Sequence, residues 1–235
     1  MKSKFYLVLS NSLIGVMLFC LSVMVFVEPI ESVFLQNVQK VYYNGNTEGK
    51  SVSLMINVYW GNEYLDDILK TLDKYSIKTT FFVGGIWAEK YNEDLLKICS
   101  YNHEIGNHGY FHKAQDKLSF EENQNEILNN HKLIKSLTGI DMSLFAPPSG
   151  AYSETTLQVA KNLGYKTIMW TKDTIDWRDQ DEDLIYSRAT KNMKGGDLVL
   201  MHPTKATASV LERIIKFGQS INLKFTTVSE NIIKN

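Results

Sequence analysis

Short apolar runs, several of them rich in β-branched residues, alternate along this chain with stretches in which apolar positions recur at helical spacing. The runs "SVSLMINV", "TTFFV" and "DLVLMH" have the length and composition of buried strands. In "EYLDDILKTLDKY", Leu65, Ile68, Leu69 and Leu72 share one side beneath a charged face, as in an amphipathic helix. Strands that alternate with helices in this way predict an α/β domain with a mainly parallel sheet.

Capping signals set the bounds of two expected helices. Ser119 and Glu122 form a capping box that opens a long helix ending at Gly139, and a second helix runs from Ser153 to Leu163 and is ended by Gly164. About seven strands are expected, at 51–58, 79–83, 103–108, 143–148, 166–170, 197–202 and 224–228. Further helices are expected near 63–75, 93–101, 181–194 and 207–220. A barrel and an open doubly wound sheet give the same alternation, so the pattern alone leaves both folds open.

An uncharged, mostly apolar run from Phe5 to Val27 sets the beginning of the chain apart from the rest. A helix of about 20 apolar residues crosses the hydrocarbon core of a bilayer, and this run is long enough. Lys2 and Lys4 precede the run and Glu28 follows it. By the positive-inside rule, the N-terminus then lies in the cytoplasm and the body of the protein lies outside.

This run divides the chain into three expected parts, which are a membrane anchor at 1–28, a stalk or linker at 29–50 and a folded domain at 51–235. We therefore expect a single-pass protein of the cell membrane. A cleaved signal peptide and a secreted domain form the alternative. Signal peptides, however, have shorter apolar cores and a small-residue cleavage site, which this stretch does not offer convincingly.

Composition narrows the class of protein further. The chain has 235 residues, an apolar fraction of 44% and a formal net charge of -1, which are ordinary values for a globular protein. Without a basic bias, charge gives no reason to expect a nucleic-acid partner. Cys20 lies in the expected membrane helix and Cys99 in the folded domain. We therefore expect no disulfide and a domain that is held together by its core.

Two histidines stand four residues apart in "HEIGNHGYFH", at the end of a short expected strand. On a helical turn, His108 and His112 would converge on one metal ion. Two unrelated surface histidines would give the same spacing, so the spacing alone does not decide. His103 and His131 have no partner at ligand spacing, and we interpret them as incidental.

Two more polar positions follow expected strands. In "TIDW", Asp176 stands next to Trp177 and shortly after Asp173, and a single aspartate at such a place is also typical of a helix cap. In "LVLMHPT", His202 ends a buried strand before Pro203, where a hydrogen-bonded core histidine is the alternative. Each of these signals is weak by itself.

Together, the segments "INVYWG", "HGYFH", "FAPPSGAY", "DTIDW" and "LMHPT" resemble, in this order, the polysaccharide deacetylase family, which is the NodB-homology domain of carbohydrate esterases. The resemblance spans residues 50 to 230, and "NVYWGNEYL" and "FAPPSG" are similar to the sporulation-associated branch of spore-forming Gram-positive bacteria. It implies a distorted (β/α) barrel. It also implies metal-assisted removal of N-acetyl groups from a cell-wall glycan of the peptidoglycan or chitin-like type.

The resemblance also implies roles for single residues. His108 and His112 match the two histidines that hold a divalent ion, usually zinc, which polarises the acetyl carbonyl and binds the attacking water. His202 matches the general acid that protonates the leaving amine. Asp176 matches the carboxylate that orients this acid.

The expected substrate pocket has two sources. By the resemblance, Trp177 and Leu200 would line the space for the acetyl methyl group, and the backbone N–H of Ser149 would face the developing oxyanion. Aromatic residues also stand in or beside the motif loops, namely Tyr59, Trp60, Tyr110, Phe111 and Tyr152. Such rings either stack on sugar rings or pack the barrel, and the sequence supports both roles equally. Of this group we assign Trp60 and Tyr152 to the pocket.

The match fails where the family has paired aspartates at the end of the first strand. Asn57 stands in place of the general base, Val58 in place of the third metal ligand, and Ala146 in place of an arginine that positions the base. An amide does not accept a proton near neutral pH, and loss of a positioned base typically lowers the rate by ~10² to 10⁴. Two imidazoles without a third ligand should also bind the metal weakly.

Three functions therefore remain open. The first is a working deacetylase in which another carboxylate, such as Asp173 or Glu63, replaces the missing base. The second is a catalytically inactive, membrane-tethered protein that binds cell-wall glycan. The third is a membrane-tethered interaction protein in cell-wall or spore assembly, in which the cleft has no role.

Overall fold

The computed structural model describes residues 12, 14–19 and 40–233. The expected membrane helix from Phe5 to Val27 lies largely outside the described residues. Within the described ranges, no helical segment combines the length and the apolar character that a bilayer-crossing helix needs. From Lys40 onward the chain forms one compact unit.

A sheet of nine strands, each parallel to its neighbours, forms the centre of this unit. The strands are β1 (Val41–Tyr42), β2 (Ser51–Val58), β3 (Thr80–Val83), β4 (Glu104–Asn107), β5 (Leu144–Phe145), β6 (Lys166–Ile168), β7 (Lys172–Asp173), β8 (Leu198–Met201) and β9 (Lys224–Phe225). Their order is β1-β6-β5-β4-β3-β2-β8-β7, and β9 pairs with the first residues of β2. In the described part of the chain the outermost strands β1 and β7 do not pair with each other. The sheet is therefore a curled α/β sheet that stays open.

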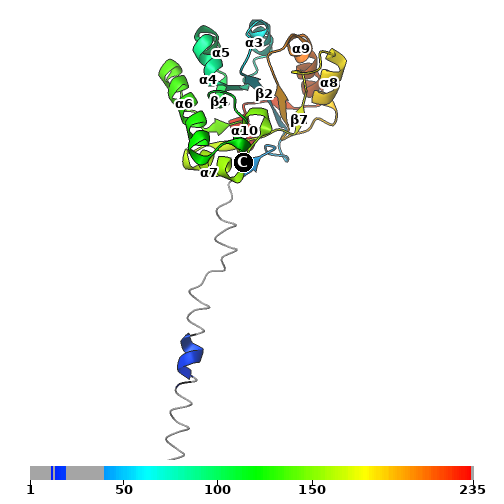
Figure 1. Cartoon of the computed structure of the whole chain (residues 1–235). Coiled ribbons are helices and arrows are strands. Elements are labelled where there is room, and N and C mark those ends of the chain that lie inside the picture. The colour runs from blue at the N-terminus through cyan, green and yellow to red at the C-terminus, as the bar shows by residue number, and fades with distance from the viewer. Residues whose placement is uncertain (1–11, 13, 20–39, 234–235) are drawn as a thin grey trace, which may run out of the picture. The chain divides into compact units, whose positions relative to one another are not determined.

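Helices follow most of the strands and stand along the outer side of the curved sheet, from α6 through α3 to α8 (Figure 1). They are α3 (Leu65–Lys74), α4 (Gly85–Lys90), α5 (Asn92–Ser100), α6 (Phe120–Thr138), α7 (Glu154–Asn162), α8 (Glu182–Thr190), α9 (Lys205–Ser220) and α10 (Val228–Ile232). The capping box at Ser119 and the left-handed Gly139 bound α6 as the sequence predicts.

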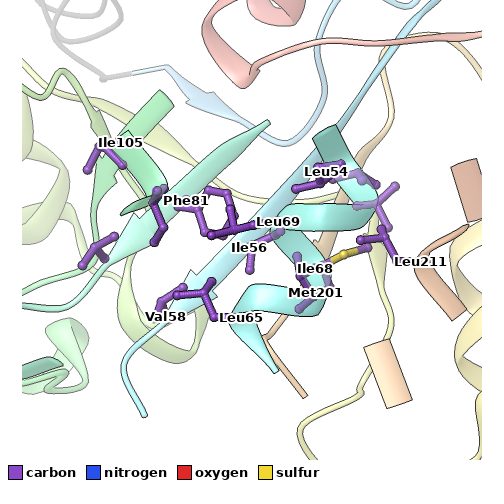
Figure 2. Packing of buried hydrophobic residues seen from close by; sticks show 14 of the residues in the cluster. Leu54, Ile56, Val58, Leu65, Ile68, Leu69, Phe81, Ile105, Met201 and Leu211 are labelled. Atoms are coloured by element: carbon purple, nitrogen blue, oxygen red, sulfur yellow. The ribbon is translucent and has the colours of Figure 1, made fainter. Parts of the chain in front are cut away.

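The two faces of β2 show how the core is divided. Because side chains alternate along a strand, Leu54, Ile56 and Val58 point together toward the helices, where Val58 lies beside Leu65 of α3 (Figure 2). Met55 belongs to the second apolar cluster, on the inner side of the sheet. Asn57 follows Met55 on this inner face. The alternation thus decides which residues at the end of β2 reach the interior of the curled sheet.

The structure differs from the sequence expectation in several elements. Nine strands replace the expected seven, because β1 lies in the segment expected as a stalk and β7 in a polar segment after an expected strand. The helix α4 was also unexpected, and α8 ends at Thr190 instead of near residue 194. The expected boundary of the domain at residue 51 is wrong as well. Residues 41 and 42 pair with β6, and Gly45 N–H donates to the Gly196 carbonyl, so the domain begins near residue 40.

Candidate functional site

The polar residues that follow the strands meet at the carboxyl ends of the sheet, where α/β folds of this type place their sites. A cavity of about 260 Å³ opens there. Its lining consists of Asn57, Tyr59, His108, His112, Ser149, Trp170, Asp173, Trp177, Leu200 and His202. Segments that are far apart in the sequence, following β2, β4, β6 and β8, therefore contribute to one cavity.

The loop that follows β4 brings the two closely spaced histidines together. The ring centroids of His108 and His112 lie 4.9 Å apart. The expectation of a helical turn is wrong, since residues 108–112 form an irregular loop. Asn107 Oδ1 accepts the Gly109 N–H at 2.9 Å, and the Glu126 carboxylate accepts the Phe111 N–H at 2.9 Å. These buried acceptors satisfy the backbone of the loop in place of a helix.

His108 is completely buried, and its orientation is fixed by a backbone carbonyl. Its Nδ1 lies 2.7 Å from the Ala146 oxygen, which only accepts, so Nδ1 carries the hydrogen. The other nitrogen, Nε2, is then a lone-pair acceptor, and it has no hydrogen-bond partner among the described residues. Burial, with His112 and His202 nearby, holds the pKa of His108 well below its ordinary value.

His112 lies against the ring of Tyr59, with centroids 3.5 Å apart and ring planes 13° from parallel. Burial first and the neighbouring His202 second lower the pKa of His112 to about 4. The imidazole is therefore neutral at physiological pH.

His202 and Asp176 form a buried pair on the other side of the cavity. The Asp176 carboxylate accepts His202 Nδ1–H at 2.8 Å and the His202 backbone N–H at 2.7 Å. The Thr207 hydroxyl donates to the same carboxylate. These bonds fix the ring plane of His202 and place its hydrogen on Nδ1.

Tyr59 occupies the space between the three histidines. Its ring centroid lies 5.8 Å from that of His108 and 6.2 Å from that of His202, in addition to the stacked contact with His112. Burial, and then the negative charge of Asp176, raise the pKa of the Tyr59 hydroxyl, which therefore keeps its proton.

The position of Tyr59 corrects the sequence interpretation of Val58. Val58 does not stand at the place of a metal ligand, because strand alternation turns its side chain into the helix-facing core. Tyr59, which follows the end of β2, lines the cavity and reaches the two closely spaced histidines. The alternation in "LMINVYW" was the signal that could have identified it. Ala146 likewise lies in the inner apolar cluster, and the backbone carbonyl is its contribution to the site.

The residues at the cavity do not fit a catalytic metal centre. Such a centre usually takes three protein ligands. Within the described residues, no group of three or more histidine, cysteine, aspartate or glutamate side chains is placed to hold one ion. The space beside the two imidazoles holds the aromatic ring of Tyr59 instead of a carboxylate. The donor set is limited to His108 and His112.

Asn57, Asp173 and Glu63 differ in their position relative to the cavity. Asn57 is buried in the cavity wall, and its Oδ1 has no hydrogen-bond partner in the described structure. Asp173 lines the cavity, with Oδ1 accepting the Ile175 N–H at 2.8 Å. Glu63 is not among the lining residues, and its carboxylate accepts the Asn62 N–H.

The expected pocket residues fall into two groups. Ser149, Trp177 and Leu200 line the cavity. Trp60 lies outside the lining but packs on His202, with ring centroids 5.0 Å apart. Tyr152 also lies outside, where its hydroxyl bonds that of Tyr43. Sequence reasoning did not identify Trp170, because a large residue directly after a strand is also typical of core packing.

Three of the seven described non-glycine residues with positive φ lie at or beside the cavity. His112, Ser149 and Ile175 all have positive φ, at 57°, 56° and 54°. A β-branched residue rarely adopts this conformation, and residues held in it are often found at functional sites. The strain places His112 and Ser149 in the cavity wall and sets the turn just before Asp176.

Comparison with known proteins identifies relatives of the chain. The sequence model described as polysaccharide deacetylase matches residues 44–168. The uncharacterised protein YlxY of Bacillus subtilis is 36% identical over 200 residues, which is 85% of this chain and 63% of that protein. A peptidoglycan-N-acetylglucosamine deacetylase of Bacillus cereus is 30% identical over 173 residues, which is 71% of this chain and 81% of the relative.

The similar solved structures include one that is described as a pseudoenzyme. The crystal structure of a CE4 family pseudoenzyme from Bacillus anthracis superposes with a TM-score of 0.81 at 35% identity, covering 83% of this chain and 69% of that one. A mutant of that pseudoenzyme, described as having restored enzymatic activity, gives a TM-score of 0.81 at 34% identity. It covers 83% of this chain and 71% of the mutant chain.

Proposed function

Because the chain belongs to the polysaccharide deacetylase family, we propose that it is a cell-wall glycan-binding member in which metal-assisted N-deacetylation is weakened or lost. Membership of the family indicates the class of substrate. The residues at the cavity are the reason to propose that the reaction is weakened or lost. The relatives named above include both a peptidoglycan deacetylase and a pseudoenzyme.

The ring of Tyr59 among the three histidines is the observation that carries this proposal. Hydrolysis of an N-acetyl group needs an activated water molecule, which a metal ion or a general base supplies. The donor set does not fit a catalytic metal. The Asn57 amide is no base near neutral pH, and the Tyr59 hydroxyl keeps its proton because its pKa is raised.

The half of the site that would face a glycan has the residues that the family resemblance implies. His202 and Asp176 form the pair expected of a general acid, and Trp177 and Leu200 line the cavity. Exposed aromatic rings such as Trp60 and Trp177 give flat surfaces on which sugar rings stack. We propose that this surface still binds N-acetylglucosamine- or N-acetylmuramic-type polymers. The proposed place of action is the outer side of the cell membrane, to which the N-terminal run would tether the domain, in vegetative or sporulating cells.

Acetate release from N-acetylated peptidoglycan fragments, measured together with fragment binding, tests this function. We expect saturable binding with acetate release at least ~10²-fold below that of an active relative. Release by the parent that is abolished in His108→Ala would contradict the proposal, since it would show a working metal enzyme. Absence of binding to every fragment would contradict it from the other side.

One observation favours a second candidate function. Asp173 lines the cavity and forms no ion pair with the described residues, so it is placed to take up a proton from water. If the chain is a slow deacetylase with this base, Asp173→Asn should abolish the residual acetate release. Glu63→Gln should leave the release unchanged, because Glu63 lies outside the cavity.

A further inference from the structure

Three features of the cavity point to a ligand with a positive charge. The first is its charge. Among the described residues that line it, Asp173 is the one with a carboxylate facing the space, and no lysine or arginine is present. Asp173 also forms no direct ion pair in the described structure, so no lysine or arginine side chain covers its carboxylate. The guanidinium of Arg178, which lies over Trp177 and interacts with Asp173 at longer range, is paired with Asp179 through both Nε and a terminal nitrogen.

The second feature is an aromatic wall. Tyr59, Trp170 and Trp177 all line the same cavity. The faces of such rings attract ammonium groups, and cages built from them are used to recognise organic cations. Three aromatic residues and one unpaired carboxylate form the chemical combination that such cages use.

The third feature is a pair of acceptors without donors. Asn57 Oδ1 and His108 Nε2 are buried, belong to lining residues and have no hydrogen-bond partner within the described chain. An ammonium group brings three N–H donors and no acceptor, whereas an acetamido group brings one N–H and a carbonyl oxygen that itself needs a donor. These two unpaired acceptors match the N–H donors of an amine.

We propose that the cavity binds the protonated amine of an unacetylated glucosamine residue in cell-wall glycan. This inference rests on the proposed glycan-binding function and names the form of the sugar. A cavity of about 260 Å³ has room for one sugar-sized group, below the range typical of drug-sized ligands. The protein would then bind glycan that other enzymes have already deacetylated.

Calorimetric titration of the full chain, purified in detergent, tests the proposal. The probes are the β-1,4-linked tetramers of glucosamine and of N-acetylglucosamine, at a pH where the amine is protonated. We expect the amine tetramer to bind about tenfold more tightly, the size of effect that an ammonium in an aromatic, partly desolvated site produces. Acetate is assayed in each sample, so that conversion of the acetylated probe is detected.

A variant and a matched control assign the preference to the cavity. Asp173→Asn should abolish the preference for the amine while leaving the Ile175 N–H its acceptor, so the turn is expected to persist. Glu63→Gln removes a charge of the same kind from a neighbouring loop outside the cavity and should leave the preference unchanged. Thermal unfolding of each variant verifies that it is folded, and Trp177→Leu provides a second variant that should weaken amine binding.

The outcomes separate this inference from the proposed function. Equal or tighter binding of the acetylated tetramer would overturn the amine proposal and leave glycan binding intact. Absence of binding to both tetramers would overturn both. A preference for the amine that survives in Asp173→Asn would overturn the assignment to this cavity.

Discussion

At the scale of single residues, the side chain at position 59 determines which chemistry the cavity can perform. It follows directly after β2, two residues beyond Asn57, and lies between His108, His112 and His202. A carboxylate in this place would complete a ligand set of two histidines and one aspartate, which is a common arrangement for divalent zinc.

Replacing this ring should therefore create a metal site. We expect Tyr59→Asp to bind Zn²⁺ at least about tenfold more tightly than the parent, because it adds a third, anionic ligand. Zinc titration by calorimetry, with metal content of the purified protein, measures the effect.

Val58→Asp is the matched control for this substitution. It places the same carboxylate one residue earlier, where the side chain faces Leu65 and the helices, as Figure 2 shows. We expect no gain in zinc affinity and a marked loss of stability, since an unpaired charge would be buried. Equal zinc binding by the two variants would refute the assignment of faces on β2.

The pair of His202 and Asp176 gives a second test at this scale. Asp176→Asn removes the charge that holds His202 and leaves the buried Thr207 hydroxyl and the His202 N–H with a weaker acceptor. We expect a loss of about 1–3 kcal/mol in the free energy of unfolding, measured in urea. Asp67→Asn on an exposed helix face is the control and should change the free energy by less than about 0.5 kcal/mol. A neutral effect of Asp176→Asn would show that the pair does not stabilise the fold.

At the scale of elements, the sequence predicted long patterned segments well and short ones poorly. The run "SVSLMINV" predicted β2, and the capping box predicted the start of α6, because both depend on local residue types. Strands β1 and β7, unlike the equally short β5 and β9, were not predicted because they lie in polar segments without an apolar run. They exist because tertiary pairing with β6 and β8 completes them.

The candidate site was predictable to the extent that it depends on chain order. The order of the motifs predicted that four residues meet at one edge of the sheet, namely His108, His112, Asp176 and His202. The structure places all four at or beside the cavity. It misassigned Val58, because the choice between two adjacent positions depends on which face of a strand each occupies. That choice is set by the packing of the whole strand between two layers.

The loop after β4 should depend on a buried carboxylate of α6. Glu126→Ala removes the acceptor of the Phe111 N–H, and we expect a loss of about 1–3 kcal/mol in stability. Hydrogen exchange of the Phe111 amide should accelerate as the loop that carries His112 loosens. Asn125→Ala, at an exposed neighbouring position on the same helix, is the control. Unchanged exchange at Phe111 in Glu126→Ala would rule out this role.

At the scale of the whole molecule, buried neutral histidines make stability depend on pH. Burial lowers the pKa of His103 from 6.5 to about 4 in the folded protein. Between these values the unfolded chain binds a proton that the folded chain does not, so stability falls as the pH decreases from about 6.5 to about 4. Above this range the contribution of His103 is constant.

His103→Asn separates this contribution from those of the other histidines. Asparagine keeps an acceptor for the Thr79 N–H near the position of Nδ1, but it does not titrate. The free-energy difference between parent and variant should shift in favour of the variant as the pH is lowered from 7 to 4. Urea unfolding at several pH values measures this shift. A difference that stays constant with pH would exclude His103 as a source of acid sensitivity.

The open sheet has one more consequence, for behaviour at high concentration. An uncovered sheet margin offers unpaired amides and carbonyls to a second molecule, and this is a common beginning of aggregation. Here the two outermost strands, β1 and β7, are each only two residues long. Edge strands this short can form few backbone hydrogen bonds with a second chain. The sheet can therefore stay open and still resist self-association.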